Sequence, residues 1–483
     1  MGSRPQGEGF GPNYELPEHT AYCETCAAIA NVYWSYRMFL LTGESKYMDV
    51  VERALYNGVI SGVSLSGDRY FYDNPLASVG QHERAPWFGC ACCPGNITRF
   101  MPSVPGYTYA VKGDEIYVNL FAEGYADIKT ANGEITVKQE TAYPWDGKIK
   151  ITFANVKGNG IKINIRIPGW ALGTPVAGDL YSYSDKVKEK VTITLNGNDV
   201  PVNTNEGYVK LAQAVSEKDE IILNLPMQVR KVAANEKVEY LKDKTALQRG
   251  PVVYCLEAAD QSDKHVFNLF EPQLKSIKAE FEEGLLGGVV TLTGNAGKFI
   301  NGRKSSSNQP FKAVPYYSWN NRGAGEMTVW IAEDKDAAHP VPEPTLASKS
   351  KAVSSSDQIP GLNDQFEPVN SRDISKPYFY WWLRNGSTEW VEYDFPADEE
   401  VSNVQVYWLE LEHYDGSFKI PESWEVKYYD GKEWMPVKGV KPYTIEKDKY
   451  STVTFEKVKT KKIRVYAKLQ KGFSGGILEL KVK

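Results

Sequence analysis

The sequence contains no apolar run that approaches the ~18 residues needed to cross a bilayer, so no membrane-spanning helix is expected. It also lacks an excess of basic residues. The net charge of -5 and the pI near 5.8 argue against a nucleic-acid partner, which usually requires a basic face. The first residues, Met-Gly-Ser, have neither the basic nor the apolar region of a signal peptide. Localisation is therefore open: periplasmic or secreted if an upstream region carries a signal peptide, otherwise cytoplasmic.

Cysteines are few and unevenly placed. Six occur in the chain, and five of them lie before residue 94. The disulfide framework of a small secreted domain would spread them more evenly. Their clustering therefore indicates metal ligation or thiolate chemistry, with buried and inert cysteines as the plain alternative.

Helical periodicity is confined to the first hundred residues. The pattern predicts a helix over residues 24–42 that ends at Gly43, a natural C-cap. Ser45 is expected to cap a second helix over residues 46–60, and a third, shorter helix is expected to begin near Pro94. Three helices cannot enclose a core of their own. We therefore expect this part to be the end of a larger helical domain.

From about residue 107 the apolar residues alternate with a period of two, which predicts short strands separated by Gly, Asn and Asp turns. The length of 483 residues suggests about three or four domains. We expect a mixed α and β architecture in five parts: helices over residues 1–106, a β-sandwich over 107–227, a second β-sandwich over 228–333, a polar linker over 334–360, and a last β-sandwich over 361–483.

Two short segments concentrate the thiols. Cys23-Glu24-Thr25-Cys26 lies at the start of the first predicted helix, and Cys90-Ala91-Cys92-Cys93-Pro94 lies just before the third. Free backbone N–H groups and the helix dipole stabilise thiolates at a helix N-terminus. Soft sulfur ligands select Zn²⁺ over harder cations, so we expect zinc. The spacing is not that of a zinc ribbon, and a closed structural zinc site remains an alternative on spacing alone.

Four motifs of this part, YCETCA, ERALYNG, YFYDNPL and WFGCACCPGN, resemble the signature series of glycoside hydrolase family 127, the β-L-arabinofuranosidases. Further along, RGPVVYCLE and AVPYYSWNNRGAGEM also resemble that family, so the similarity covers roughly residues 5–332. It implies an (α/α)₆ catalytic barrel, of which residues 1–106 would be the C-terminal part, followed by jelly-roll-like β-sandwiches. Most barrel helices would lie upstream of residue 1. The chain is therefore expected to be a fragment with little activity by itself.

The resemblance also implies the residues of the site. Four residues would hold zinc: Glu24, Cys26, Cys92 and Cys93. Of these, Cys92 would be the nucleophile. Glu8, in the context Gly-Glu-Gly-Phe, would be the general acid/base. Glu52 and Tyr72 match positions that line the sugar pocket of the family.

A thiolate nucleophile is chemically sound in such a site. Retaining glycosidases normally use two carboxylates, and a thiolate in place of one still gives a covalent route, through a thioglycosyl intermediate. A free thiol has a pKa near ~8.5 and is largely protonated at neutral pH, whereas a thiol that coordinates zinc is deprotonated. We therefore expect a retaining, zinc-dependent hydrolase that acts on terminal β-L-arabinofuranosyl or related sugars of a plant-type oligosaccharide or glycan.

Two points stay open. A non-catalytic carbohydrate-binding protein with a structural zinc is the main alternative, although a closed zinc site would need no acid such as Glu8 in a Gly-rich loop. Cys23 and Cys90 are additional thiols that could replace one of the implied ligands. The oligomeric state is also open, with a homo-oligomer as one candidate.

Residues 361–483 resemble a discoidin-type (F5/8 C) β-sandwich in the segments LNDQFEP, YWWLRNGSTEWVEYDF, ESWEVKYYDGKEW and KIRVYAKL. This part is rich in aromatic residues, which can stack on sugars or fill a β-sandwich core. Packing is expected for most of Trp381, Trp382 and Trp390, and carbohydrate binding is the alternative for them.

Overall fold

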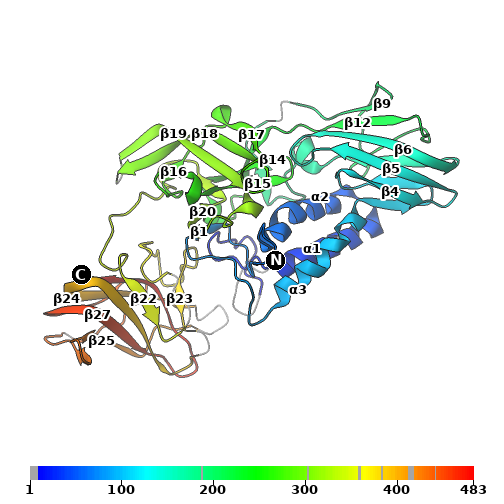
Figure 1. Cartoon of the computed structure of the whole chain (residues 1–483). Coiled ribbons are helices and arrows are strands. Elements are labelled where there is room, and N and C mark those ends of the chain that lie inside the picture. Colours follow the sequence, from blue (N-terminus) through cyan, green and yellow to red (C-terminus); the bar gives the residue numbers. More distant parts are fainter. Residues whose placement is uncertain are drawn as a thin grey trace. The chain divides into compact units, whose positions relative to one another are not determined.

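The computed structural model describes residues 9–186, 189–301, 304–356, 361–381, 384–411, 418–440 and 442–483. They form two compact units. Unit 1 contains residues 10–16 and 22–340, and unit 2 contains residues 17–21 and 341–483. The mixed α and β composition expected from the sequence is confirmed: the α-helices precede strand β2, and strands dominate the rest of the chain (Figure 1).

The described part of unit 1 contains three α-helices, namely α1 (Thr25–Thr42), α2 (Ser45–Arg53) and α3 (Cys92–Phe100). α1 ends as predicted, because Gly43 adopts a φ of 76° and its N–H donates to the Phe39 carbonyl. This left-handed conformation favours glycine. None of the described helices is long and apolar enough to cross a membrane.

The second predicted helix is less regular than its pattern indicated. After α2 the chain continues into a π-helical segment (Ala54–Val59) and a 3₁₀ turn (Ile60–Gly62). The expected cap at Ser45 is wrong, because Glu44 is the N-cap residue and no side chain caps the helix. Instead, Ser45 is the first helical residue and its N–H donates to the Glu206 carbonyl, 2.8 Å away.

The third helix begins two residues earlier than Pro94 suggested, so Cys92 and Cys93 lie in its first turn. A 3₁₀ segment (Met101–Tyr107) follows it. Shorter 3₁₀ turns occur later in the chain at Gly169–Leu172, Glu239–Leu241, Ala258–Asp260, Leu274–Ser276 and Tyr316–Ser318.

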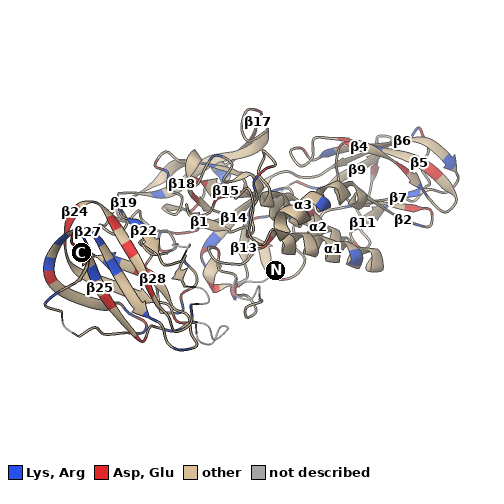
Figure 2. Cartoon of the chain, turned by 60° about the horizontal axis from the view of Figure 1, so that its bottom comes forward, with Lys and Arg blue, Asp and Glu red and all other residues tan. Residues whose placement is uncertain are grey.

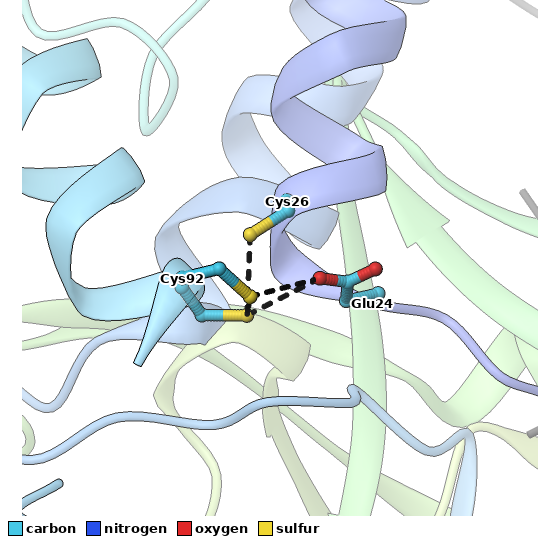
Figure 3. Close-up of side chains that lie close together, drawn as sticks. Glu24, Cys26 and Cys92 are labelled. Carbon is cyan, nitrogen blue, oxygen red and sulfur yellow. Dashed lines mark hydrogen bonds between the residues drawn. The ribbon is translucent and has the colours of Figure 1, made fainter. Parts of the chain in front are cut away.

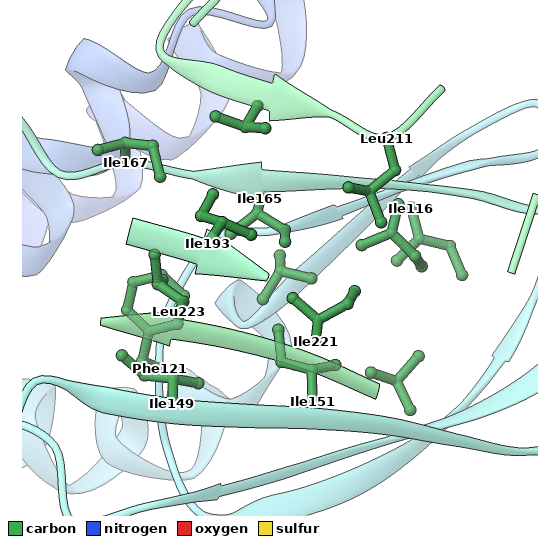
Figure 4. Close-up of a cluster of buried hydrophobic side chains, with 14 of the residues drawn as sticks. Ile116, Phe121, Ile149, Ile151, Ile165, Ile167, Ile193, Leu211, Ile221 and Leu223 are labelled. Atoms are coloured by element: carbon green, nitrogen blue, oxygen red, sulfur yellow. The ribbon is translucent and has the colours of Figure 1, made fainter. Parts of the chain in front are cut away.

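Two sheets enclose an isoleucine-rich core after the helices (Figure 4). A four-stranded sheet has the order β11-β7-β3-β2, and a six-stranded sheet has the order β10-β9-β12-β6-β5-β4. The alternation of β6 explains the arrangement, since Ile149 and Ile151 point inward and Lys148 outward. Each buried isoleucine stabilises the fold by about 1.5–3 kcal/mol. The strand bounds are β2 Tyr109–Lys112, β3 Glu115–Val118, β4 Gly124–Lys129, β5 Gly133–Thr141, β6 Lys148–Gly158, β7 Lys162–Arg166, β9 Thr192–Leu195, β10 Asn198–Val200, β11 Tyr208–Lys210 and β12 Glu220–Asn224.

A third, 11-stranded sheet has the order β1-β20-β15-β19-β18-β16-β21-β14-β13-β8, with β17 paired to β18. It takes β1 from the helical part and β8 from the region of the preceding sandwich. β20 and β21 are separated at Val329, whose N–H donates to the Leu76 carbonyl. The bounds are β1 Ala77–Val79, β8 Tyr181–Tyr183, β13 Val229–Ala234, β14 Lys244–Arg249, β15 Val252–Glu257, β16 Leu269–Phe270, β17 Lys278–Glu282, β18 Val289–Asn301, β19 Lys304–Pro315, β20 Glu326–Thr328 and β21 Trp330–Ala332.

Unit 2 contains a seven-stranded sheet of order β23-β28-β24-β27-β25-β26, with β22 paired to β24. β24 is one strand of 21 residues, and its pairing with β27 has a register irregularity between Asp394 and Glu399. The bounds are β22 Lys351–Ser354, β23 Phe379–Tyr380, β24 Thr388–Trp408, β25 Ser423–Tyr429, β26 Trp434–Pro436, β27 Ser451–Lys468 and β28 Gly476–Val482.

The tryptophans of unit 2 have different environments. Trp381 is fully buried in the core, and Trp382 lies outside the described residues. Trp390 is half-buried, and the Arg464 guanidinium lies 4.0 Å above its ring. The same guanidinium pairs with the Glu392 carboxylate at 2.6 Å, within the alternating acidic and basic residues of β24 and β27 (Figure 2).

The expected linker over residues 334–360 needs a correction. β22 lies within it and pairs antiparallel with β24, from Lys351 opposite Asp394 to Ser354 opposite Val391. Ala347 and Ala352 are buried in the unit 2 core. A four-residue edge strand is too short to show clear alternation, and the surrounding Pro, Ser and Lys residues hid it.

Unit 2 also includes a segment from the other end of the chain. The His19 ring lies 5.7 Å from the Phe366 ring, and the Thr20 hydroxyl donates to the Ile374 carbonyl. His19 is only 4% exposed. Residues 17–21 are therefore a structural part of unit 2.

Unit 2 should fold from residues 341–483 alone, but with a lower melting temperature from residues 361–483. The shorter fragment lacks β22 and the buried Ala347 and Ala352. Thermal unfolding followed by circular dichroism compares the two fragments. Equal melting temperatures would contradict the assignment of β22 to this unit.

Candidate metal and thiolate site

The site lies where the first turns of two helices meet. Glu24 is the N-cap residue of α1 and Cys26 its second residue, whereas Cys92 and Cys93 open α3. Figure 3 shows the Glu24 carboxylate and the Cys26 and Cys92 sulfurs pointing toward one another. One ligand atom from each of the four residues lies within 4.8 Å of all the others. The structure thus brings together the four residues that the family resemblance implied as metal ligands.

The spacing of the donor atoms suits a tetrahedral ion. Cys93 Sγ lies 3.4 Å from Cys26 Sγ and 3.7 Å from Cys92 Sγ. Glu24 Oε1 lies 3.4 Å from Cys92 Sγ and 3.6 Å from Cys93 Sγ. Zn–S bonds of about 2.3 Å in a tetrahedron place two sulfurs about 3.7 Å apart. Three sulfurs and one carboxylate oxygen at these separations fit Zn²⁺ in both chemistry and size.

The protonation state of the thiols also bears on metal binding. Burial raises the pKa of the Cys26 thiol to about 12, and burial together with Cys26 raises the pKa of Cys93 further. Both thiols are therefore protonated at neutral pH while no cation is bound. A coordinating cation replaces these protons.

Buried hydrogen bonds fix the segment that carries Glu24. The Asn74 side-chain amide donates to the Cys23 carbonyl at 3.1 Å and to Thr25 Oγ1 at 3.0 Å, and its oxygen accepts from Ser61 Oγ at 2.6 Å. Thr25 and Ser61 are fully buried. Gly62 permits this contact, because a Cβ there would lie 2.5 Å from the Thr25 side chain.

Tyr72 lies beside the cluster. Its carbonyl accepts from the Thr25 N–H and lies 3.8 Å from Cys93 Sγ. Hydrogen bonding with Tyr22 raises the pKa of the Tyr72 phenol, with burial and Cys92 as further causes. Its predicted role at the sugar stays a prediction, but its phenol makes a hydrogen bond with Cys92. Glu8, the predicted acid/base, lies outside the described residues.

The Glu52 side chain is buried and is surrounded by hydrogen-bond donors, away from solvent. Its carboxylate accepts from Arg166 at 2.6 Å, from the Tyr143 hydroxyl at 2.7 Å and from Trp170 Nε1 at 3.2 Å. Arg166 is fully buried and also pairs with Asp49 at 2.6 Å. Burial lowers the pKa of Arg166, but the Glu52 and Asp49 carboxylates more than offset it and raise it overall. Contact of Glu52 with a sugar stays a prediction. The structure shows it in an ion pair that joins α2 to β7.

The additional thiols and the nearby histidines are not members of the four-ligand group. Among the described residues, the four-ligand group includes neither Cys23 nor Cys90. Burial raises the pKa of Cys23 to about 11, and Cys90 is exposed. His19 belongs to unit 2, and His82 Nδ1 lies 3.0 Å from Ser78 Oγ. Neither histidine is in the group of potential ligands.

Sequence reasoning missed one neighbour of the cluster. The Asn96 amide nitrogen lies 3.0 Å from Cys26 Sγ. Asn96 follows Cys92 by four residues on α3, a spacing that places two side chains on the same helix face. That spacing, in the motif CCPGN, was the available signal.

Comparisons with known proteins agree on one protein family. Three family models match successive regions: the GH127 β-L-arabinofuranosidase catalytic domain over residues 1–106, the GH127 middle domain over 115–227, and the family 127 C-terminal domain over 229–332. All three models belong to one family of glycoside hydrolases. The chain belongs to glycoside hydrolase family 127.

Relatives support the same conclusion. A non-reducing end β-L-arabinofuranosidase of Bifidobacterium longum is 34% identical over 360 residues, which cover 68% of this chain and 52% of the relative. A solved GH127 β-arabinofuranosidase is 44% identical with a TM-score of 0.67, over 71% of this chain and 54% of the other. A GH127 β-L-arabinofuranosidase from Geobacillus stearothermophilus T6 is 36% identical with a TM-score of 0.63, over 69% and 53%. The chain spans about half the length of these relatives.

The purified chain should bind about one zinc ion, because the structure places one set of four donors together. Cys26→Ser should lower both the zinc content after dialysis and the melting temperature. Cys23→Ser is the matched control and should retain the metal, because Cys23 is outside the set. Elemental analysis of the dialysed proteins provides the measurement. A folded wild-type chain without metal would contradict the site.

Arg166→Met should lower the free energy of unfolding by about 3–5 kcal/mol, because it leaves buried carboxylates without their cation. Adding Glu52→Gln to this variant should recover part of the loss. Urea denaturation measures both values. A loss below ~1 kcal/mol in the single variant would show that the pair contributes little to stability.

Proposed function

We propose that the chain carries the nucleophile and metal ligands of a retaining glycoside hydrolase that releases terminal β-L-arabinofuranosyl or a closely related sugar from a glycan. The observation that carries this proposal is the Glu24, Cys26, Cys92 and Cys93 cluster in a chain of family 127. The substrate class follows from the relatives, whose names state β-L-arabinofuranosidase activity.

Zinc is the proposed metal, with these four residues as its ligands. When bound, it keeps the coordinating thiols deprotonated at neutral pH. Three thiolates and one carboxylate exceed its charge, so the sulfurs remain electron-rich. The net negative charge also suits an oxocarbenium-like transition state.

Exposure supports Cys92 as the nucleophile. The adjacent Cys93 is fully buried between Cys26 and the Tyr72 carbonyl, whereas Cys92 is partly exposed. Cys92 is the first residue of α3, where free backbone N–H groups and the helix dipole favour a thiolate.

The proposed reaction has two steps. Cys92 Sγ bonds to the anomeric carbon as the bond to the leaving oxygen breaks, and Glu8 gives that oxygen a proton. Glu8 then takes a proton from water, whose oxygen bonds to the anomeric carbon as the C–S bond breaks. Two displacements retain the anomeric configuration. Glu8 enters this scheme through its motif alone.

One observation favours the alternative, a non-catalytic carbohydrate-binding protein with a structural metal. On α1, Trp34 is 68% and Leu41 81% exposed, so this face of the helix is open to solvent. A barrel that encloses a sugar would be expected to cover such a face. We therefore expect weak or no turnover of aryl β-L-arabinofuranosides by this chain alone. Unit 2 is proposed to be a discoidin-like accessory module.

In a form of the protein that turns over an aryl β-L-arabinofuranoside, Cys92→Ser should lower kcat by many orders of magnitude, on the order of 10⁶. A serine hydroxyl is not ionised at neutral pH, so it is a poor nucleophile. Cys90→Ser is the control and should retain activity, because that thiol is exposed and outside the cluster.

The covalent step can be tested by intact-mass and peptide analysis after treatment with a sugar that carries an electrophile at its anomeric carbon. Labelling at Cys92 supports the proposal. Labelling at Glu24 with Cys92 unmodified would overturn the thioglycosyl route.

A further inference from the structure

The Asn96 side chain lies between the Cys26 thiol and the Arg99 guanidinium. It lies half-buried on α3, and its amide nitrogen Nδ2 lies 3.0 Å from Cys26 Sγ. Its amide oxygen Oδ1 accepts from Arg99 Nη2 at 2.6 Å. Arg99 is held in turn by a second bond, from Nε to the Gly95 carbonyl at 3.2 Å.

These two contacts determine the orientation of the Asn96 amide. A guanidinium can only donate, so the amide oxygen must face Arg99. The amide N–H groups then face Cys26, which can only accept once its proton is lost. The reverse orientation would put two donors against each other at Arg99 and two acceptors against each other at Cys26. Arg99 thus directs a hydrogen-bond donor at one sulfur of the cluster.

An N–H group aimed at a thiolate makes a charge-assisted hydrogen bond. Such a bond draws electron density from the sulfur and fixes the direction in which it points. It thereby reduces repulsion among three thiolates and a carboxylate in one site, and makes the accepting sulfur a poorer nucleophile. Outer partners of metal ligands commonly change metal affinity by about 10–100-fold.

We propose that Asn96, oriented by Arg99, is a positioning residue that commits Cys26 to the role of metal ligand. The inference rests on the proposed metal and thiolate site. It adds a distinction between the sulfurs: Cys26 accepts a fixed amide donor, whereas Cys92 lies against Glu24, Cys93 and the Tyr72 phenol. This division of roles favours attack by Cys92.

Cobalt(II) tests the proposal in the full 483-residue chain, without any need for turnover. Its sulfur-to-metal charge-transfer absorption reports the electron density on the thiolates, and competition with a chelator gives its affinity. Asn96→Leu keeps the side-chain volume but removes the donor. We expect its cobalt affinity to fall about 10–100-fold and the absorption to move to lower energy at similar intensity.

Two further variants complete the test. Thr98→Val is the matched control, since it removes a polar group from the same helix whose bond goes to the Pro94 carbonyl at 2.7 Å. It should match the wild type in affinity and spectrum. Arg99→Leu alters an exposed side chain and should shift both readouts in the same direction as Asn96→Leu, by a smaller amount. Circular dichroism of the metal-free proteins verifies that each variant is folded.

The outcomes separate this inference from the proposed function. A wild-type chain that shows no thiolate-to-cobalt absorption would remove the metal site itself. A wild-type chain with that absorption, matched by Asn96→Leu in both affinity and spectrum, would overturn only the role of Asn96. If Asn96→Leu changes both readouts but Arg99→Leu changes neither, Arg99 does not orient the Asn96 amide, and the role proposed for Arg99 is wrong.

Discussion

The site depends on one constraint. Its four donor atoms, three sulfurs and one carboxylate oxygen, repel one another once they are deprotonated, yet the protein must hold them within contact distance. A bound cation would balance part of this charge, but the protein itself supplies the geometry of the four donors. It does so with two helix starts, whose free N–H groups favour negative charge. Asn74 and the fully buried Thr25 and Ser61 hold the first of these starts in place. The scaffold around the thiols is thus made of buried, satisfied hydrogen bonds.

The helices that carry the site are also held by the β-sandwich that follows them in the chain. Glu52 at the end of α2 is neutralised by Arg166 from β7, so helical part and sandwich share one buried ion pair. The same ion pair on the protein surface would contribute little to stability, because water screens exposed charges. Burial makes this pair intolerant of losing one partner. The sandwich next to the helices therefore supports them directly.

Much of the site could be predicted because its residues are local in sequence. The C-cap at Gly43 and each pair of thiols at a helix start are signals contained within a few residues, and the structure follows them, whereas the meeting of the two helix starts joins residues 67 positions apart. The ion pair of Glu52 could not be predicted, because Arg166 lies 114 residues away and depends on the packing of α2 on β7. The bonds of Asn74 to Thr25 and Ser61 depend on tertiary packing in the same way.

The errors also have local physical causes. β22 is four residues long and lies at a sheet edge, so its burial is decided by β24 and not by its own pattern. Ser45 is a good capping residue by type, but the chain turns one residue earlier and Glu44 takes the position. Pro94 marks the first turn of α3 without marking its first residue. Residue type thus located the starts of α2 and α3 to within a turn, whereas the position of β22 was decided by its neighbour β24.

The make-up of unit 2 has a consequence for synthesis on the ribosome. Thr20 leaves the exit tunnel early, whereas its partner Ile374 lies 354 residues later. At translation rates of about 5–20 residues per second, the interval between them is about 20–70 s. His19, 4% exposed in the finished protein, stays without its Phe366 neighbour throughout that time. Completion of unit 2 is therefore a late event in the life of the nascent chain.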